Sequence, residues 1–274
     1  MADMPHNRYN SGNIPPRKPG IKPKAPSMNI SCRATNPLSL NDDLHKVFLD
    51  EHQAKATTAT RLFRNDELFN AITKVVLPSF FATNKTGKFC MWSTGCSSGE
   101  EVYSMAMVAA NEFERHRRPL LMEAYGTDIN PHRIAEARAG LYTKPSKDAL
   151  NQNYLRMLMN NAEIGTHDVQ MGPKLRTICK FTMFDMRNKP KKHTFHFIVC
   201  NHVLQYYDGP GQKHIIENLK AVLKPGGHLY LEGITAQGLE GTHLKKLPQA
   251  QNMYVIDESA PRSGFSSPLF TKKF

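Results

Sequence analysis

Apolar and polar positions along the chain alternate in blocks that predict strands and helices in turn. The clearest unit lies within Lys88–Arg118, where the apolar run Phe89–Trp92 predicts a buried strand and the small residues of Ser93–Gly99 predict a turn. Apolar residues then recur at the spacing of an amphipathic helix, at Val102, Met105, Ala106, Ala109 and Phe113. Ser97 or Ser98 is placed to cap that helix. A strand, a glycine turn and a helix in this order are typical of the start of a Rossmann-like fold.

The glycine turn itself indicates which ligand it would bind. Gly95 and Gly99 form a GxxxG pattern, which is neither the GxGxxG of a dinucleotide site nor a P-loop. Glu100 and Glu101 follow at the helix start, where a pyrophosphate would otherwise lie. Two carboxylates repel phosphate and attract a cation. The turn therefore predicts a cationic ligand such as S-adenosylmethionine, and the plainer alternative is an ordinary strand-to-helix turn.

A second strand and helix follow directly. Leu121–Thr127 predicts the strand, Asn130 with Pro131 predicts the helix start, and Gly140 predicts its end. Asp128 ends the strand, at the point where such folds bind ribose hydroxyls. Ribose binding is the favoured interpretation of Asp128, and a helix-capping carboxylate is the alternative.

The same alternation continues to the end of the chain. Three further runs predict strands, at Thr177–Phe184, Phe195–Cys200 and His228–Glu232, and four of the predicted strands are expected to be parallel. An amphipathic helix over Ile215–Leu223 is expected to stop at Pro225, and Met253–Ile256 is expected to form an antiparallel edge strand. The predicted fold class is α/β, a Rossmann-like, doubly wound, mostly parallel sheet with a short helical N-terminal cap.

Three regions follow from the composition. Residues 1–38 are predicted to be a disordered, basic, Pro-rich tail, 39–84 a helical N-terminal segment, and 85–274 the sheet domain, with 143–180 as a candidate inserted subdomain. In the helical segment, apolar stripes over Leu44–Phe48 and Leu68–Val76 predict two helices. The pair Asn65-Asp66 is expected to cap the second, and Pro78 to close it.

Charge and cysteine content restrict the partners. The net charge is +12, and Lys and Arg cluster in the N-terminal tail, over 172–192 and near the C-terminus. These clusters predict solvated surface or attraction to an acidic partner, of which nucleic acid is disfavoured but left open.

The five cysteines are odd in number and lack CxxC spacing, which argues against disulfides and a metal site and for the cytoplasm. No apolar run is long enough for a membrane span, and no signal peptide is evident.

A more specific set of stretches matches one enzyme family in order and spacing. They are TRLFR at 60–64, WSTGCSSGEEVYS at 92–104, GTDIN at 126–130, FHFIVCNHVLQYY at 195–207 and LKPGGHLYLEG at 223–233. With these the chain resembles the CheR-type chemoreceptor methyltransferases. Those are S-adenosylmethionine-dependent protein-glutamate O-methyltransferases of chemotaxis, and the resemblance covers about 55–235.

The resemblance implies roles for individual residues. It places the cofactor against Thr58, Thr60, Arg64, Gly95, Glu100, Asp128, Ile129, Asp185, Met186, Asn201 and His202. Glu100 would meet the cofactor's ammonium group, Asp128 its ribose, and Asp185 with Met186 its adenine. Arg64 and Tyr206 would lie nearest the transferred methyl group as the catalytic pair. The implied partner is a chemoreceptor-like protein with acidic side chains.

Such a reaction asks little acid–base chemistry of the protein. A glutamate side chain is already ionised at neutral pH, so the site has mainly to align the carboxylate oxygen, methyl carbon and sulfur. Arg64 is expected to orient the carboxylate, and Tyr206 to narrow the channel and hydrogen-bond a reacting group.

Two departures from the family pattern keep other hypotheses open. Asn201-His202 stands where the family has Arg-Asn, which exchanges a cation for a titratable ring, and the family's N-terminal helical domain is expected to be reduced. The first hypothesis is methylation of glutamate side chains. The second is methylation of a different oxygen or nitrogen nucleophile, on a small molecule. The third is a non-catalytic cofactor-binding interaction module, or a nucleic-acid binder using the basic tail.

Overall fold

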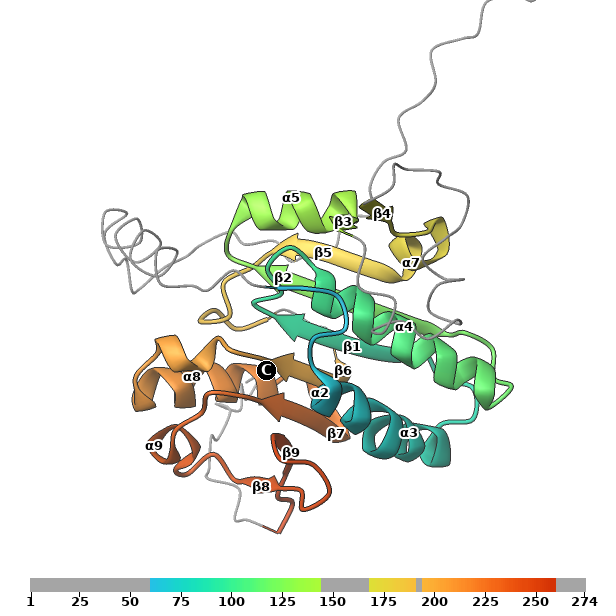
Figure 1. Cartoon of the computed structure of the whole chain (residues 1–274). Helices are drawn as coiled ribbons and strands as arrows, with labels where there is room; N and C mark the ends of the chain where they lie inside the picture. Colours follow the sequence, from blue (N-terminus) through green and yellow to red (C-terminus); the bar gives the residue numbers. More distant parts are fainter. Residues whose placement is uncertain (1–59, 144–167, 191–193, 260–274) are drawn as a thin grey trace, which may run out of the picture. The chain divides into compact units, whose positions relative to one another are not determined.

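Five parallel strands form the larger part of a seven-stranded sheet in the computed structural model, which describes residues 60–143, 168–190 and 194–259 (Figure 1). The strand order is β5-β2-β1-β6-β7-β9-β8. The strands are β1 Phe89–Thr94, β2 Met122–Asp128, β5 Cys179–Met183, β6 Phe195–Cys200, β7 Leu223–Leu231, β8 Leu244–Lys246 and β9 Met253–Ile256. The first five pair in parallel, and β9 and β8 add antiparallel pairs. The predicted mostly parallel α/β sheet is confirmed.

The strand order also fixes where a ligand would bind. From β1 the chain moves through β2 to β5 on one side, then crosses back to β6 on the other side of β1. The order therefore reverses between β1 and β6. In open parallel sheets, ligands bind beyond the carboxyl ends of the strands at this reversal.

Strand β7 differs from its prediction at its start. Pairing between β6 and β7 joins Phe195 to Leu223, breaks, and resumes at Phe197 with His228. Pro225 lacks an N–H group, and Gly226 has φ +70°, so this stretch cannot form a regular ladder. The helix expected to run to Pro225 in fact ends at Lys220, because the chain turns into the strand earlier.

The antiparallel end of the sheet was predicted only in part. Met253–Ile256 is an antiparallel strand, as expected, but β9 pairs with both β7 and β8 and is not the edge. The edge is β8, whose two lysines make it polar. Lysines on an edge strand discourage pairing with another chain. Because β8 is polar, a search for apolar runs does not predict it.

The helical segment before the sheet is longer than its prediction. Asn65 caps α2 (Asp66–Ala71) by accepting the Leu68 N–H, as predicted. A π-helical turn, η1 (Ile72–Val76), then leads into α3 (Leu77–Thr83). Pro78 therefore does not close the helix; it lies in the first turn of α3, directly after the π-helical turn. The predicted stripe at 44–48 lies outside the described residues.

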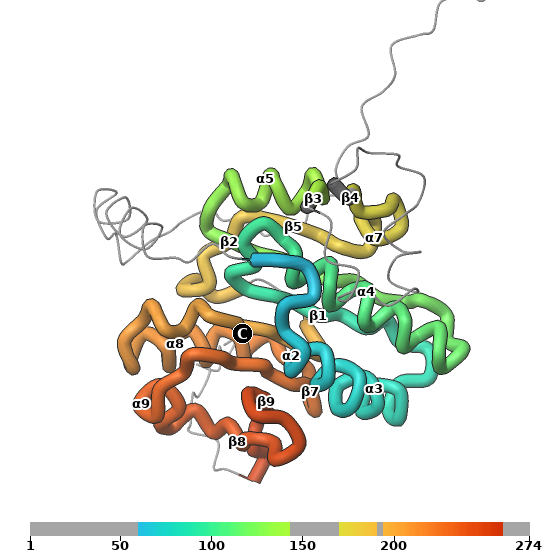
Figure 2. Tube along the Cα trace, viewed as in Figure 1, coloured from blue at the N-terminus to red at the C-terminus, as the bar shows by residue number. Residues whose placement is uncertain are grey.

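Helix α4 (Glu100–Arg115) connects this segment to the sheet. It contacts β1, β2 and β5 on one side, and η1 also packs on it. The Phe81 ring lies edge-on to Phe113 of α4, with their centroids 5.0 Å apart. The chain that leads into α2 runs between α4 and β7 (Figure 2).

The other helices are α5 (Pro131–Ala139), α7 (Pro173–Ile178), α8 (Gly209–Lys220) and α9 (Ala236–Leu239), with a 3-10 turn η3 (Leu204–Tyr206). Asn130 caps α5 and Gly140 ends it with φ +61°, as predicted. A small antiparallel sheet pairs β3 (Leu141–Thr143) with β4 (Asp168–Gln170). Within the described residues, no helix has the length and apolarity to cross a bilayer.

One half-buried histidine in the sheet leads to a pH prediction. His196 accepts the Cys90 N–H on Nδ1 at 3.0 Å, and its ring centroid lies 4.9 Å from that of Phe80. Burial and the nearby Lys224 ammonium lower the pKa of His196 to about 4. The unfolded chain binds this proton more tightly, so stability falls as pH falls from about 6.5 towards 4.

Glutamine at position 196 can accept the same hydrogen bond but does not titrate. Between pH 7 and pH 4.5 we therefore expect His196→Gln to lose about 1–2 kcal/mol less unfolding free energy than the unmodified protein, allowing for the ring's partial exposure. Urea unfolding of both proteins at the two pH values measures this. An identical pH dependence in the variant would show that His196 is not responsible.

Candidate active site at the carboxyl edge of the sheet

The turn between β1 and α4 is held by the end of β2. Gly95, Ser97 and Gly99 all have left-handed backbone, with φ of +68°, +49° and +93°. The Cys96 N–H donates to the Thr127 carbonyl at 2.9 Å, and the Ser97 N–H donates to Asp128 Oδ2 at 2.9 Å. The predicted serine cap is wrong: Gly99 occupies the cap position with no side-chain bond, because these contacts draw Ser97 towards Asp128.

Both glycines of the turn are required by their surroundings. A Cβ on Gly95 would collide with Val203, in the loop after β6, and a Cβ on Gly99 would lie 2.7 Å from the Ala137 Cβ and 3.0 Å from the Phe181 ring. The turn is therefore closely packed between the loop after β6 on one side and α5 with β5 on the other.

We expect Gly99→Ala to lower the free energy of unfolding by about 2–4 kcal/mol, because backbone strain at φ +93° adds to overpacking. Gly226→Ala is the matched control, since Gly226 has φ +70° and a Cβ added there would meet no atom within 4 Å; it should lose only the strain, about 1–2 kcal/mol. Urea denaturation of both variants measures the difference. Equal losses would mean that packing around Gly99 contributes nothing.

The two carboxylates at the start of α4 have different partners. Glu100 is buried, with 8% of its surface exposed, and its Oε2 accepts the Ser98 hydroxyl at 2.8 Å. Glu101 accepts the Ser93 hydroxyl on Oε1 and the Asn201 amide on Oε2, both at 2.8 Å. Glu100 thus remains the predicted acid of the turn, whereas Glu101 joins the ends of β1 and β6.

Asp128 is fixed at the end of β2 by two backbone groups. Its Oδ2 accepts from Ser97 and its Oδ1 accepts from the Asn130 N–H, also at 2.9 Å. A carboxylate has about four acceptor positions, so about two remain for ligand hydroxyls. Ile129, the other predicted contact here, is half-buried beside it.

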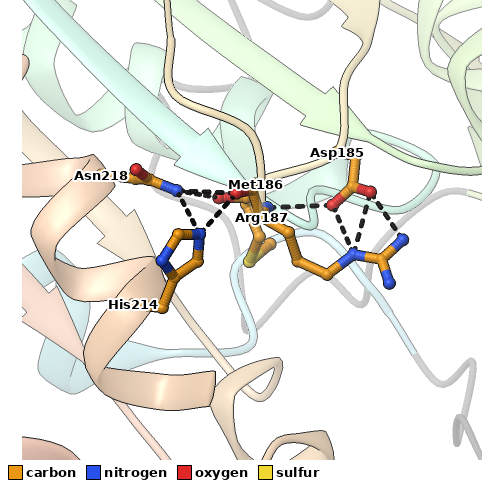
Figure 3. A network of polar contacts seen from close by, with 5 residues as sticks. All are labelled: Asp185, Met186, Arg187, His214 and Asn218. Carbon is orange, nitrogen blue, oxygen red and sulfur yellow. Dashed lines mark hydrogen bonds and ion pairs between the residues drawn. The ribbon is translucent and has the colours of Figure 1, made fainter. Parts of the chain in front are cut away.

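The loop after β5 carries the predicted adenine-side residues (Figure 3). The Asp185 carboxylate accepts from the Arg187 guanidinium, with Nη2 to Oδ2 at 2.6 Å, and this bonding raises the pKa of Arg187. The Arg187 carbonyl accepts from Asn218 of α8 at 2.9 Å and lies 2.8 Å from His214 Nε2. Arg187, assigned by sequence to a basic cluster, is therefore one partner of a partly buried ion pair.

Met186 connects this loop to the centre of the sheet. It is buried, and its sulfur lies 3.5 Å from the Thr94 hydroxyl at the end of β1. Its carbonyl accepts from the Asn218 amide at 3.3 Å (Figure 3). The loop is thus attached both to β1 and to α8.

Arg64 lies in a segment anchored at both sides. The Phe63 N–H donates to Ser104 Oγ of α4 at 3.0 Å, and Ser104 in turn donates to the Glu100 carbonyl at 2.7 Å. On the other side the Asn65 amide donates to the Tyr230 hydroxyl of β7 at 3.4 Å. Phe63 has φ +57°, a conformation that is uncommon for a bulky residue. Arg64 itself is half-buried, as is Thr60, and Thr58 lies outside the described residues.

The residues that follow β6 form the last part of the candidate site at the carboxyl edge of the sheet. Asn201 is buried, and its Oδ1 has no hydrogen-bond partner within the described part of the chain. His202 has φ +57°, and its Nδ1 lies 3.5 Å from Glu232 Oε1 at the end of β7. Tyr206 ends the short turn that follows and is half-buried.

The structure thus gathers the described candidate residues at the carboxyl ends of β1, β2, β5 and β6, together with the segment before α2. Sequence reasoning gave no role to Ser93 or Glu232, and it did not pair Glu101 with Asn201, which lies 100 positions away in the chain. Within the residues that the structure describes, no cluster of three His, Cys, Asp or Glu side chains could hold a metal ion. Their four cysteines are free and buried.

Comparison with known proteins decides the family. Residues 58–243 match the family model "CheR methyltransferase, SAM binding domain". The chain belongs to the CheR methyltransferase family. It is 30% identical over 183 residues to the chemotaxis protein methyltransferase Cher2 of Pseudomonas putida, covering 65% of this chain and 66% of the relative. It is likewise 30% identical to a chemotaxis protein methyltransferase of Listeria monocytogenes, covering 68% and 69%.

Two solved structures are distant likenesses of this chain. A TehB-like SAM-dependent methyltransferase from Corynebacterium glutamicum aligns with 78% of this CheR-family chain and 96% of its own, at 11% identity and a TM-score of 0.38. The glycopeptide N-methyltransferase MtfA aligns with 56% and 51%, at 11% identity and a TM-score of 0.34. The fold assignment rests on the strand order described above.

The edge residues of the CheR-family chain fit its cofactor, S-adenosylmethionine. The buried Glu100 carboxylate provides negative charge for a ligand that carries an ammonium and a sulfonium group. The Asn201 Oδ1, which has no hydrogen-bond partner within the described residues, provides an acceptor.

Proposed function

We propose that this chain is a protein-glutamate O-methyltransferase that modifies acidic side chains of a chemoreceptor-like protein in the cytoplasm. The names of its relatives, chemotaxis protein methyltransferases, support the substrate class. The observation that carries the proposal is the double anchoring of the segment around Arg64. Phe63 is bonded to α4 and Asn65 to β7, which holds an arginine next to the helix turn that bears Glu100.

The proposed division of labour follows the edge of the sheet. Glu100 and Asn201 would hold the amino-acid end of the cofactor, Asp128 its ribose, and the loop at Asp185 and Met186 its adenine. When bound, the cofactor supplies a methyl group on a positively charged sulfur. Arg64 would orient the acceptor carboxylate through the paired geometry that guanidinium and carboxylate groups favour. The half-buried Tyr206 would restrict the acceptor's approach and exclude water.

A second candidate function rests on the pair at the ends of β6 and β7. His202 Nδ1 lies 3.5 Å from Glu232, and a histidine oriented by a carboxylate can act as a general base. An ionised glutamate acceptor needs no base, whereas a hydroxyl or amine acceptor does. Methylation of such a nucleophile on a small molecule is the alternative that this pair favours.

One labelling experiment separates these functions. The protein is incubated with radiolabelled S-adenosylmethionine and a lysate containing chemoreceptors, and the labelled product is treated with alkali. Methyl esters hydrolyse readily in alkali, so the proposal predicts a label on protein that is released as methanol. A label that survives alkali, or that appears on a small molecule, would support the alternative. Cofactor binding without any transfer would contradict both.

A further inference from the structure

Asn201 is held in one orientation by residues that belong to two other elements. Its Nδ2 donates to Glu101 Oε2 at 2.8 Å, and the buried Ser93 of β1 donates to Glu101 Oε1, also at 2.8 Å. A carboxylate accepts hydrogen bonds, so it must face the NH₂ end of the amide and not the oxygen. The Ser93–Glu101 pair therefore leaves Oδ1 as the free end of Asn201.

That oxygen is a buried acceptor with no hydrogen-bond partner among the residues that the structure describes. Asn201 is 5% exposed, and within the described residues Oδ1 makes no hydrogen bond. Buried polar atoms in proteins are nearly always bonded, so each exception needs an explanation. Asn201 directly follows β6, beside β1, where the strand order reverses. A ligand at this point has to offer an N–H or O–H donor to satisfy the oxygen.

The sheet order indicates which part of the cofactor reaches it. Asp128, the proposed ribose acid, ends β2, and β1 lies between β2 and β6. Neighbouring strands are about 4.8 Å apart, so the ends of β2 and β6 are separated by roughly 10 Å. A ribose bound at β2 lies too far from β6, whereas the amino-acid end of the same molecule spans that distance. The donor there is its ammonium group.

We propose that Asn201 Oδ1 accepts a hydrogen bond from the ammonium group of the bound methyl donor, and that Glu101 is a positioning residue that aims this oxygen. The assignment rests on the proposed function only for the identity of the cofactor. It gives the paired carboxylates distinct tasks. Glu100 supplies charge, whereas Glu101 orients a neutral acceptor through Asn201.

The test compares two ligands that differ in the amino-acid end. S-adenosylhomocysteine carries the ammonium group, and 5′-methylthioadenosine lacks the whole amino-acid moiety. In Asn201→Leu, calorimetry should show affinity for S-adenosylhomocysteine falling about 10- to 100-fold, the size expected for a lost hydrogen bond to a charged group. Affinity for methylthioadenosine should change less than about twofold. Asn84→Leu, which removes a half-buried asparagine from the end of α3, is the matched control and should change neither affinity.

Glu101→Gln tests the positioning role and covers the case in which Asn201→Leu does not fold. It should weaken S-adenosylhomocysteine about 5- to 10-fold and leave methylthioadenosine unchanged, because the amide of Asn201 is then free to turn. A parallel loss of both ligands, or no loss, would overturn the inference. Failure of the unmodified protein to bind S-adenosylhomocysteine would instead refute the proposed function, together with this inference.

Discussion

Replacing Arg64 with alanine is expected to lower the rate of methyl transfer at least about 100-fold while cofactor affinity changes less than about threefold. The anchors on either side, from Phe63 to Ser104 and from Asn65 to Tyr230, use backbone or neighbouring side chains and remain in the variant. The variant is expected to lose the orientation of the acceptor carboxylate. Single-turnover rates with a receptor substrate, and calorimetry with S-adenosylhomocysteine, measure the two quantities separately.

Two further variants make the Arg64 result specific. Arg64→Lys keeps the charge but loses the two-pronged guanidinium geometry, so its rate should lie between those of the unmodified protein and the alanine variant. Arg61→Ala removes an exposed arginine from the same segment and should leave the rate unchanged. If Arg64→Ala lost affinity and rate to the same degree, Arg64 would act in cofactor binding alone.

Asp128→Ala is expected to weaken S-adenosylhomocysteine binding at least about 100-fold and also to destabilise the fold. The Ser97 and Asn130 N–H groups both lose their acceptor, and together this costs about 2–4 kcal/mol. The carboxylate therefore has two roles, as a ligand contact and as the bond that holds the central turn. Calorimetry and urea unfolding of the same variant measure the two effects.

Asp208→Ala is the control for the structural effect of Asp128. Asp208 caps α8 by accepting the Gly211 N–H and is exposed. Its removal should cost about 1 kcal/mol of stability and leave cofactor affinity unchanged. If Asp128→Ala behaved in the same way, losing stability without affinity, Asp128 would be only a helix-capping carboxylate.

Local signals in the sequence were sufficient for much of the fold. The helix at 131–139 was predicted with its cap and its glycine end, because Asn130 and Gly140 act on their own neighbours. Gly99 was not recognised as the cap of α4, because the contact that displaces the serines comes from Asp128, which lies in another strand. Pro225 was treated as a helix stop, whereas the register break opposite β6 accommodates it within β7.

The sequence predicted which residues form the site, but not which contacts these residues make with one another. The resemblance indicated Glu100, Asp128 and Asn201, which all lie at the edge that the strand order selects. It could not show that Glu101 binds Asn201, since the two are 100 positions apart and meet only when β6 pairs with β1. The ion pair of Asp185 with Arg187 was likewise hidden within a run of basic residues.

We infer that the turn between β1 and α4 binds a cationic methyl donor and not a nucleotide phosphate. Titration calorimetry of the full chain with S-adenosylmethionine, and separately with ATP and NAD, tests it most directly. We expect one-to-one binding of S-adenosylmethionine, weakened by Glu100→Gln, and no heat from the phosphate-containing ligands at the same concentrations. Absence of S-adenosylmethionine binding, or binding of ATP or NAD that Glu100→Gln strengthens, would contradict it.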